Sequence, residues 1–180
     1  MGGFGSRQLT LALMHRMRDL NAGRVEDALR EMDASRAEIR AAHTMWTRWA
    51  HSRTAPKGVR AFRAALGPPL STSVRDFGDL PCEVATWKLV HWPDFEFELL
   101  LGPDGRLWNQ WFVRAGEPKA IAFADLAPWT AVVSDVGASF EGAEHVEGSA
   151  PHHWAVDFTH EGEAHRALFV YGLLQRVDRR

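Results

Sequence analysis

The period at which apolar residues recur changes near residue 70, and no other feature limits the fold as strongly. Before this point apolar residues recur every three to four positions, as on one face of an α-helix, beginning with Leu11, Met14 and Met17. Beyond it they alternate with polar residues, as on the faces of a β-strand. The chain therefore predicts several helices followed by a sheet, an order typical of the α+β class.

Three or four helices are predicted before the first strand. The first ends at the segment Asn21 to Gly23, because these residue types tolerate the left-handed conformation that often closes a helix. Ser35 and Glu38 have the spacing of a capping box, in which each side chain caps the backbone of the other residue at the start of a helix. A further helix is predicted from Thr54 to Leu66.

Residues 71–81 read as a loop, and strand candidates follow it, separated by turns rich in Pro, Gly and Asp. Because their connections are too short to hold crossover helices, we expect a mainly antiparallel sheet. The six candidates are residues 83–92, 95–101, 107–114, 129–136, 153–159 and 164–173.

A Gly-Glu-Pro-Lys segment at residues 116–119 marks a candidate boundary. We expect residues 8–115 to form a helix-plus-sheet core, and residues 120–180 to form a β-rich extension that completes or covers the same sheet. A chain of 180 residues is long enough to bury roughly 70% of its unfolded surface. The predicted fold is α+β, with N-terminal helices packed on a curved, mainly antiparallel β-sheet and a β-rich C-terminal extension.

The segment Pro103 to Gly105 predicts a hairpin with a three-residue loop, closed by the glycine in the left-handed region. This loop pairs Leu99 with Asn109. It also pairs Phe97 with Trp111, so the four side chains share one face of the hairpin. That face is otherwise apolar along its whole length, and Asn109 is its single polar member.

An amide on such a face needs a partner, because a buried polar group without one costs about 1 to 3 kcal/mol. Either a loop or helix end docks onto Asn109, or its amide lines a cavity and faces a ligand or water. Single polar groups in an apolar cavity are how binding pockets orient their contents.

Charge and composition exclude several classes of partner. The net charge is -2, with 13 Lys and Arg against 8 Asp and Glu in residues 1–80, and 8 against 15 in residues 81–180. The arginines alternate with acidic residues, as on a solvated helix face, so we expect no nucleic-acid partner. No apolar run approaches the ~20 residues of a membrane span, and we expect no membrane partner. The single cysteine, Cys82, favours a reducing cytoplasm.

Three stretches resemble the nuclear transport factor 2-like superfamily, which has a cystatin-like cone. The opening LTLALMHRMRDLNAGRVEDALREM is similar to the first two helices of that family, with a polar, small and Gly break between them. The segments TMWTRWA to FRAALGPPLST and FEFELLLGPDGRLWNQWFV are similar to the later part of the cone. The resemblance covers about residues 8–115.

The resemblance implies a conical pocket between the concave face of the sheet and the helices. Members include ketosteroid isomerases, dehydratases, epoxide hydrolases and polyketide cyclases, alongside proteins that only bind or dimerise. Isomerase-type chemistry needs an acidic residue in the cone with a Tyr or a protonated acid opposite. Here the predicted register places Glu96 and Glu98 on the outer face, and Tyr171 lies outside the matching region.

His43 lies on the apolar stripe of the predicted third helix. It is either a hydrogen-bonded residue at the rim of the core or a general acid or base at the mouth of the pocket, because imidazole titrates near neutrality. The predicted ligand-binding residues of the pocket wall are Trp46, Trp49, Phe97, Asn109 and Trp111.

The histidines near the C-terminus approach a metal-binding pattern at one place, formed by His160, Glu163 and His165. Their spacing matches no established motif, and we expect no metal and no cofactor. A two-residue loop after His160 instead predicts a hairpin in which Asp157 forms a cross-strand ion pair with Arg166.

The leading interpretation is a small-molecule-binding protein of the nuclear transport factor 2-like type, with an apolar, Trp-lined pocket for an apolar or aromatic ligand. Acid-base chemistry of the isomerase, cyclase or dehydratase kind would then depend on His43. The alternative is a non-enzymatic module for protein interaction or dimerisation, in which an exposed β-face binds a partner or forms a homodimer.

Overall fold

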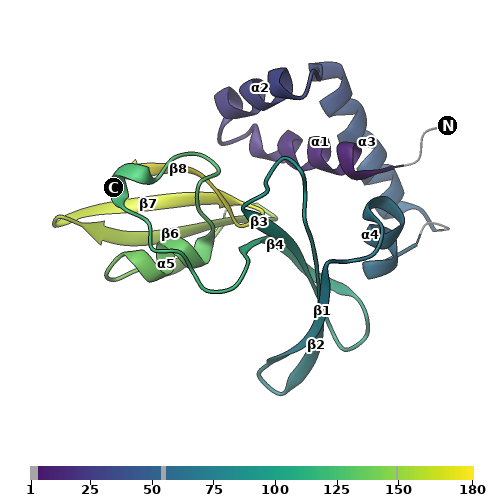
Figure 1. Ribbon diagram of the computed structural model, residues 1–180. Helices are drawn as coiled ribbons and strands as arrows, with labels where there is room; N and C mark the ends of the chain where they lie inside the picture. Colours follow the sequence, from purple (N-terminus) through teal and green to yellow (C-terminus); the bar gives the residue numbers. More distant parts are fainter. Residues whose placement is uncertain (1–3, 54–55, 149) are drawn as a thin grey trace.

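The computed structural model describes residues 4–53, 56–148 and 150–180. A layer of helices lies beside two four-stranded antiparallel sheets (Figure 1). The N-terminal helices are α1 (Ser6–Met17), α2 (Ala22–Glu31), α3 (Arg36–His51) and α4 (Val59–Leu66). The first sheet, in the order β1-β2-β3-β4, is formed by Ser71–Phe77, Leu80–Trp87, Phe95–Leu101 and Leu107–Arg114.

A short 3-10 helix, η1 (Phe123–Asp125), and the helix α5 (Val133–Ser139) connect the two sheets. The second sheet, in the order β5-β6-β7-β8, is formed by Glu144–Glu147, His153–His160, Glu163–Val170 and Leu173–Arg179. The predicted α+β class, with N-terminal helices packed on an antiparallel sheet, is confirmed. None of the described helices is long and apolar enough to cross a bilayer.

The helical layer agrees with the sequence except at one junction. Ser35 and Glu38 form the predicted capping box at the start of α3. Asn21 does not close α1, which ends earlier; its side chain instead accepts a hydrogen bond from the N–H of Arg24 and caps α2. Asn is among the most favoured N-cap residues. This explains why Asn21, which was expected to end α1, begins α2 instead. The predicted helix start at Thr54 lies outside the described residues.

Strand β1 corrects the prediction of a loop at residues 71–81. All seven of its residues are exposed, because β1 is an edge strand of a hairpin that extends away from the rest of the molecule (Figure 1). A strand that is exposed to solvent on both faces has no alternation of apolar and polar residues. The sequence pattern therefore did not indicate a strand here.

The register predicted for the β3–β4 hairpin is wrong beyond its first pair. A β-bulge between Leu100 and Leu101 shifts the pairing by one residue, so Asn109 lies opposite Leu100 and Gln110 lies opposite Leu99. Because a shift of one residue turns every side chain to the other face, Asn109 lies on the face of the sheet that points away from the helices.

The inner face of the first sheet forms the main core with the helices. The side chains of Phe97 and Phe112 meet there at 5.1 Å between ring centroids, and both are buried. Residues from the second sheet join the same buried cluster, among them Val170 and Leu173. The second sheet therefore contributes to the main core, and it also has a buried cluster of its own that includes Val156, Phe158 and Phe169.

The β6–β7 hairpin has the predicted register. Asp157 pairs with Arg166, and the guanidinium donates two hydrogen bonds of 2.6 and 2.7 Å to the carboxylate, so the predicted ion pair is confirmed. The predicted strand 164–173 is divided by a turn at Tyr171 and Gly172, where both residues have positive φ. The predicted strand 129–136 is wrong, because this segment leads into α5.

Hydrogen bonds at β4 fix the C-terminal part of the chain to the first sheet. The carbonyl of Tyr171 accepts a hydrogen bond of 2.7 Å from the N–H of Phe112. Arg114 at the end of β4 donates hydrogen bonds to both carboxylate oxygens of the fully buried Asp135 in α5. Residues 120–180 thus form a sheet of their own rather than adding strands to the first, and the division of the chain at residues 116–119 stays a prediction.

Candidate ligand-binding cleft

The predicted site residues do not come together in one pocket. Asn109 and Trp111 line a cleft between the two sheets, which we call the inter-sheet cleft. Trp46 and Trp49 line a second hollow beside α3 and α4, which we call the helix-side hollow. Phe97 is completely buried and lines neither space. The wrong register accounts for this separation, because it had placed Asn109 on the face that meets the helices.

The inter-sheet cleft has a volume of about 360 Å³. Strand β4 forms one wall, and the start of α5, strands β5 and β6 and the turn before β8 form the others. Its lining residues are Asn109, Trp111, Phe112, Val113, Val132, Val133, Ser134, His145, Trp154 and Gly172.

Two tryptophans from different sheets give the inter-sheet cleft its aromatic surface. The rings of Trp111 on β4 and Trp154 on β6 meet edge to face, with 6.2 Å between centroids and an angle of 88° between planes. This is a favourable geometry for an aromatic pair. Three valines lie beside them. The cleft is therefore apolar and is held in shape by contacts between the two sheets.

Polar groups are few in the inter-sheet cleft. The side-chain carbonyl of Asn109 accepts a hydrogen bond of 2.8 Å from the N–H of Gln110. Its amide N–H groups have no hydrogen-bond partner among the described residues. Ser134 and His145 also line the cleft, and both are exposed to solvent. The amide N–H groups of Asn109 are therefore available to donate a hydrogen bond to a molecule in the cleft.

The amide that lies on the helix-facing side belongs to Gln110. Its side chain is 6% exposed, and its Oε1 atom is buried without a partner among the described residues. The sequence prediction of a single carboxamide on the apolar face was therefore right in kind and wrong by one position. Gln110 lines neither the inter-sheet cleft nor the helix-side hollow.

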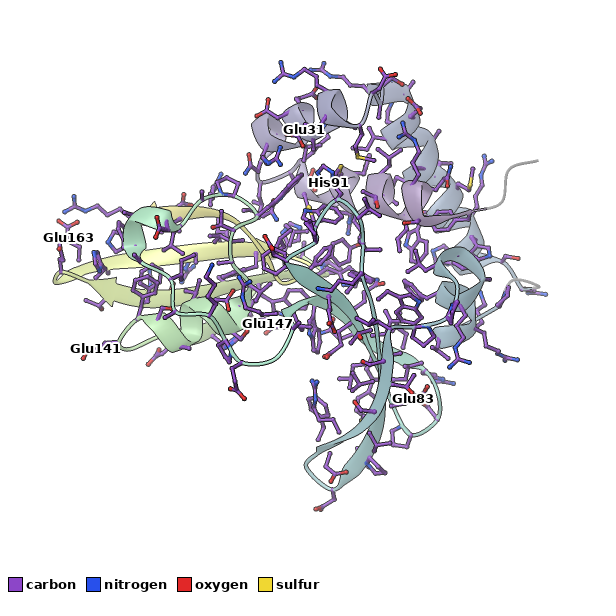
Figure 2. The ribbon with its side chains drawn as sticks, in the orientation of Figure 1. Glu31, Glu83, His91, Glu141, Glu147 and Glu163 are labelled. Atoms are coloured by element: carbon purple, nitrogen blue, oxygen red, sulfur yellow. The ribbon has the colours of Figure 1, made fainter. Side chains whose placement is uncertain are left out.

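The helix-side hollow has a different character. Its volume is about 760 Å³, and it lies between α3, α4 and the loop joining β3 to β4. In Figure 2, Glu83 and Glu147 mark β2 and β5, which border the helix-side hollow and the inter-sheet cleft respectively. Besides Trp46, Trp49 and several aliphatic residues, the hollow is lined by five charged residues, namely Lys57, Arg60, Glu83, Asp104 and Arg106.

His43 lines neither space. Its ring stacks on that of His15 in α1, with 4.1 Å between centroids and 5° between planes. Burial lowers the pKa of His43 below its usual value, and the nearby Arg16 lowers it further. A role for His43 as acid or base stays a prediction, and no substrate-sized space adjoins it among the described clefts.

The C-terminal histidines pack against aromatic rings. His160 stacks on Phe123 at 4.3 Å, and His165 packs on Phe158 at 5.6 Å between centroids. Within residues 4–53, 56–148 and 150–180, no group of three or more His, Cys, Asp or Glu is arranged to hold a metal ion.

The sequence did not point to Trp154, Gly172 or the valines of α5 as parts of the site. These residues lie in the predicted extension, which had been expected to complete or cover the same sheet. The alternation around Trp154 marked it as a strand residue, but no local signal shows that its strand faces β4.

Comparison with known proteins adds little to this description. No protein-family model matches the sequence, and no curated protein matches it. One solved structure that is similar is a "putative beta-lactamase inhibitor protein" from Streptococcus mutans, with 11% identity and a TM-score of 0.30, covering 73% of this chain and 86% of that one. A likeness of this size does not assign the protein to a family, and the resemblance to the nuclear transport factor 2-like superfamily stays a prediction.

Proposed function

We propose that the protein binds an apolar, aromatic small molecule in the inter-sheet cleft. The observation that supports this most strongly is the cleft itself, in which tryptophans from both sheets and three valines surround about 360 Å³. Ligand sites are typically concave, mainly apolar spaces of roughly 300 to 1,000 Å³ with a few polar groups. The inter-sheet cleft has these properties, whereas the helix-side hollow is lined by many charges.

The lining also suggests the chemistry of the ligand. No Lys, Arg, Asp or Glu lines the cleft in the described part of the chain, so a charged ligand would lose its hydration without gaining an ion pair. The amide N–H groups of Asn109 suit a ligand that carries a carbonyl or another hydrogen-bond acceptor. An uncharged aromatic compound with one such acceptor fits best.

Binding rather than catalysis is the function that this lining favours. His145 is the one imidazole of the lining set, and no Asp, Glu, Lys, Cys or Tyr lines the cleft beside it in the described part of the chain. General acid-base chemistry usually requires a positioned partner as well. A cytoplasmic location is part of the proposal and is supported by the single cysteine, Cys82, which is reduced and fully buried.

The proposal is tested by titrating the protein with uncharged polycyclic compounds, half of them carrying a carbonyl. Binding at a hundredfold excess over Kd stabilises a protein by about 2.7 kcal/mol, which a thermal shift detects. We expect a shift that Trp154→Leu abolishes and Trp108→Leu preserves, because Trp108 is 48% exposed and lies outside the cleft. Equal loss in both variants, or no shift with any compound, would refute the proposal.

The variant Asn109→Leu separates the polar from the apolar contribution to ligand affinity. We expect this variant to bind the carbonyl compounds about three- to tenfold more weakly, because a typical hydrogen bond contributes about 0.5 to 1.5 kcal/mol. Its affinity for the compounds without a carbonyl should stay the same or increase. Equal weakening for both halves of the panel would contradict the role given to the amide.

A dimerisation module is the second candidate, and the edge strand β1 favours it. Val74 is 70% exposed, and Phe77 and Leu80 beside it are also exposed apolar residues. An exposed edge strand with apolar side chains is a template for pairing with a second copy. Sedimentation should then show a dimer that Val74→Lys converts to a monomer, and a monomer at all concentrations would remove this candidate.

A further inference from the structure

The outer edge of β1 is uncovered, whereas the other edges of the two sheets are covered or charged. At the edge of β4, the N–H of Phe112 donates a hydrogen bond to the carbonyl of Tyr171. At the edge of β8, the carbonyl of Gln175 accepts a hydrogen bond of 2.9 Å from the side chain of Asn21. Strand β5 is only four residues long and two of them are Glu, which discourages pairing. Among the described strands, β1 is the long edge strand in which every residue is exposed.

The backbone of β1 presents a row of donors and acceptors along this edge. Phe77 and Leu80 pair across the two-residue turn that joins β1 to β2, and such a turn is typically closed by a hydrogen bond between those residues. Bonded and non-bonded pairs alternate along an antiparallel ladder. Thr72, Val74 and Asp76 therefore direct their N–H and C=O groups away from β2, and such a row is a template for one more strand.

The side chains of β1 lack the features that usually keep an edge strand apart from other strands. The strand contains no Pro and no Lys, and its pairing with β2 has no bulge. Its one cation, Arg75, donates hydrogen bonds of 3.0 and 2.9 Å to the two carboxylate oxygens of Glu98, so its charge is already compensated within the sheet. At the middle of the strand, Val74 is an apolar side chain in water, with 70% of its surface exposed.

We propose that β1 pairs antiparallel with β1 of a second copy of this chain, so that Val74 lies opposite the partner's Val74. The two four-stranded sheets then form one continuous eight-stranded sheet across the dimer. This inference deepens the second candidate function and rests on it, since it names the surface and the register of that dimer. It is independent of the ligand in the inter-sheet cleft.

Symmetry limits the registers that such a dimer can adopt. A two-fold axis perpendicular to the sheet keeps each residue on the same face in both copies, and residues that lie opposite each other across two strands also share a face. One residue of β1 must therefore lie opposite its own copy. When that residue is Val74, the strand overlaps its copy along its full length, with Ser71 at one end opposite Phe77.

Charge favours Val74 as the central residue. In this register Asp76 lies opposite the partner's Thr72, whose hydroxyl can donate to the carboxylate, and Arg75 lies opposite the partner's Ser73. A register centred on Arg75 or on Asp76 would place like charges directly opposite each other, which is destabilising. A register centred on Ser73 would leave two residues of each strand without a partner. The sequence of β1 is therefore complementary to itself in one register.

The shape of the molecule leaves room for this pairing. The hairpin that carries β1 extends away from the rest of the molecule (Figure 1). Because the two copies of β1 run in opposite directions, their helical layers lie at opposite ends of the shared strands. A single pair of strands is a small interface, so we expect a reversible dimer whose fraction rises with protein concentration.

Sedimentation velocity at a series of protein concentrations tests the edge. The natural sequence should show a dimer at high concentration, and Val74→Lys should abolish it because two cations would then lie opposite each other. Val90→Lys is the matched control, since Val90 is 92% exposed in the loop between β2 and β3 and should leave the dimer unchanged. A monomer at all concentrations, or equal effects of the two variants, would overturn the proposal.

Cysteine cross-linking identifies the register. The native thiol of Cys82 is fully buried, so a cysteine added to the exposed strand is the one that reacts. Disulfides require Cα atoms within about 7 Å of each other. Under mild oxidation Val74→Cys should form a covalent dimer, because directly opposite Cα atoms of a bonded pair lie roughly 5.5 Å apart. Ser73→Cys is displaced from its copy by two residues, or roughly 8 Å in all, and should not cross-link.

Two further cysteines complete the comparison. Asp76→Cys lies still farther from its copy and should not cross-link, and Val90→Cys measures the background from random encounters. Cross-linking that is strongest at Ser73, or as strong at Asp76 as at Val74, would overturn the register. A monomer in sedimentation removes the second candidate function as well, whereas a dimer with a different cross-linking pattern removes the β1 pairing alone.

Discussion

Asn109 and Gln110 show how one residue decides which space a polar group serves. They are adjacent on β4 and therefore point to opposite faces of the sheet. Asn109 faces the inter-sheet cleft, with its carbonyl bonded to the backbone and its N–H groups directed to no protein acceptor in the described structure. Gln110 faces the main core, where its carbonyl oxygen has no partner among the described residues.

Gln110→Leu should therefore leave stability unchanged or raise it, because the change removes a buried acceptor that gains nothing from folding. The measurement is the free energy of unfolding in urea. Gln175→Leu is the matched control: Gln175 is also buried, but it accepts a hydrogen bond from Trp129 Nε1 and donates one to the carbonyl of Leu173. Loss of those bonds should cost about 1 to 3 kcal/mol. A larger loss at Gln110 than at Gln175 would contradict this reading of the two amides.

At the scale of elements, the turn between β7 and β8 fixes the second sheet to the first. Gly172 has a φ of 72°, and a Cβ atom placed there would lie 2.8 Å from the carbonyl oxygen of Phe112. The turn between β6 and β7 has a similar backbone at Gly162, with φ of 79°, but open space around it.

This pair of turns gives a direct comparison. Gly162→Ala should lower the free energy of unfolding by about 1 kcal/mol, because alanine is unfavourable in the left-handed conformation. Gly172→Ala carries the same backbone cost and also pushes β4 away from the turn, so it should destabilise the protein by at least about 1 kcal/mol more. Equal free energies of unfolding for the two variants would show that the contact between Gly172 and Phe112 is not tight in solution.

The same elements show what the sequence could predict. Asp157 and Arg166 were paired correctly because a Glu-Gly loop sets the register of its hairpin. The turn at Tyr171 was missed because a tyrosine rarely signals a left-handed position and the residues around it read as one apolar strand.

The candidate site was the least predictable part. Its position depends on a β-bulge between Leu100 and Leu101, which no local sequence pattern predicts. It also depends on the packing of Trp154 against Trp111, which are 43 residues apart in the chain. Residue types on the wall were predictable from the sequence, whereas their neighbours depend on how two sheets meet. Trp111 and Asn109 line a cleft in the structure, but their neighbours there are not the ones predicted.

At the scale of the whole molecule, the histidines make folding depend on pH. The pKa values of His15, His43, His91, His152 and His153 are lowered in the folded protein, in each case mainly by burial. In Figure 2, His91 lies below helix α2, on which Glu31 is labelled. The unfolded chain therefore binds more protons than the folded one once pH falls below about 6.5.

The free energy of unfolding should accordingly be lower at pH 5.5 than at pH 7.5, and the loss should occur below about pH 6.5, as pH falls toward the lowered folded values. Urea denaturation at a series of pH values measures it. His43→Gln should reduce the dependence, whereas the exposed His51 is a control whose change to Gln should not. Stability that rises on acidification over this range would contradict the burial of neutral histidines.

The central claim is that a ligand occupies the space between the two sheets, and a crystal structure of the complex tests it most directly. The protein should be crystallised with the compound that gives the largest thermal shift. The account predicts density for the compound between Trp111 and Trp154, with a hydrogen bond from Asn109 to its acceptor. Density between Trp46 and Trp49 instead, or an inter-sheet cleft closed by its own side chains, would contradict it.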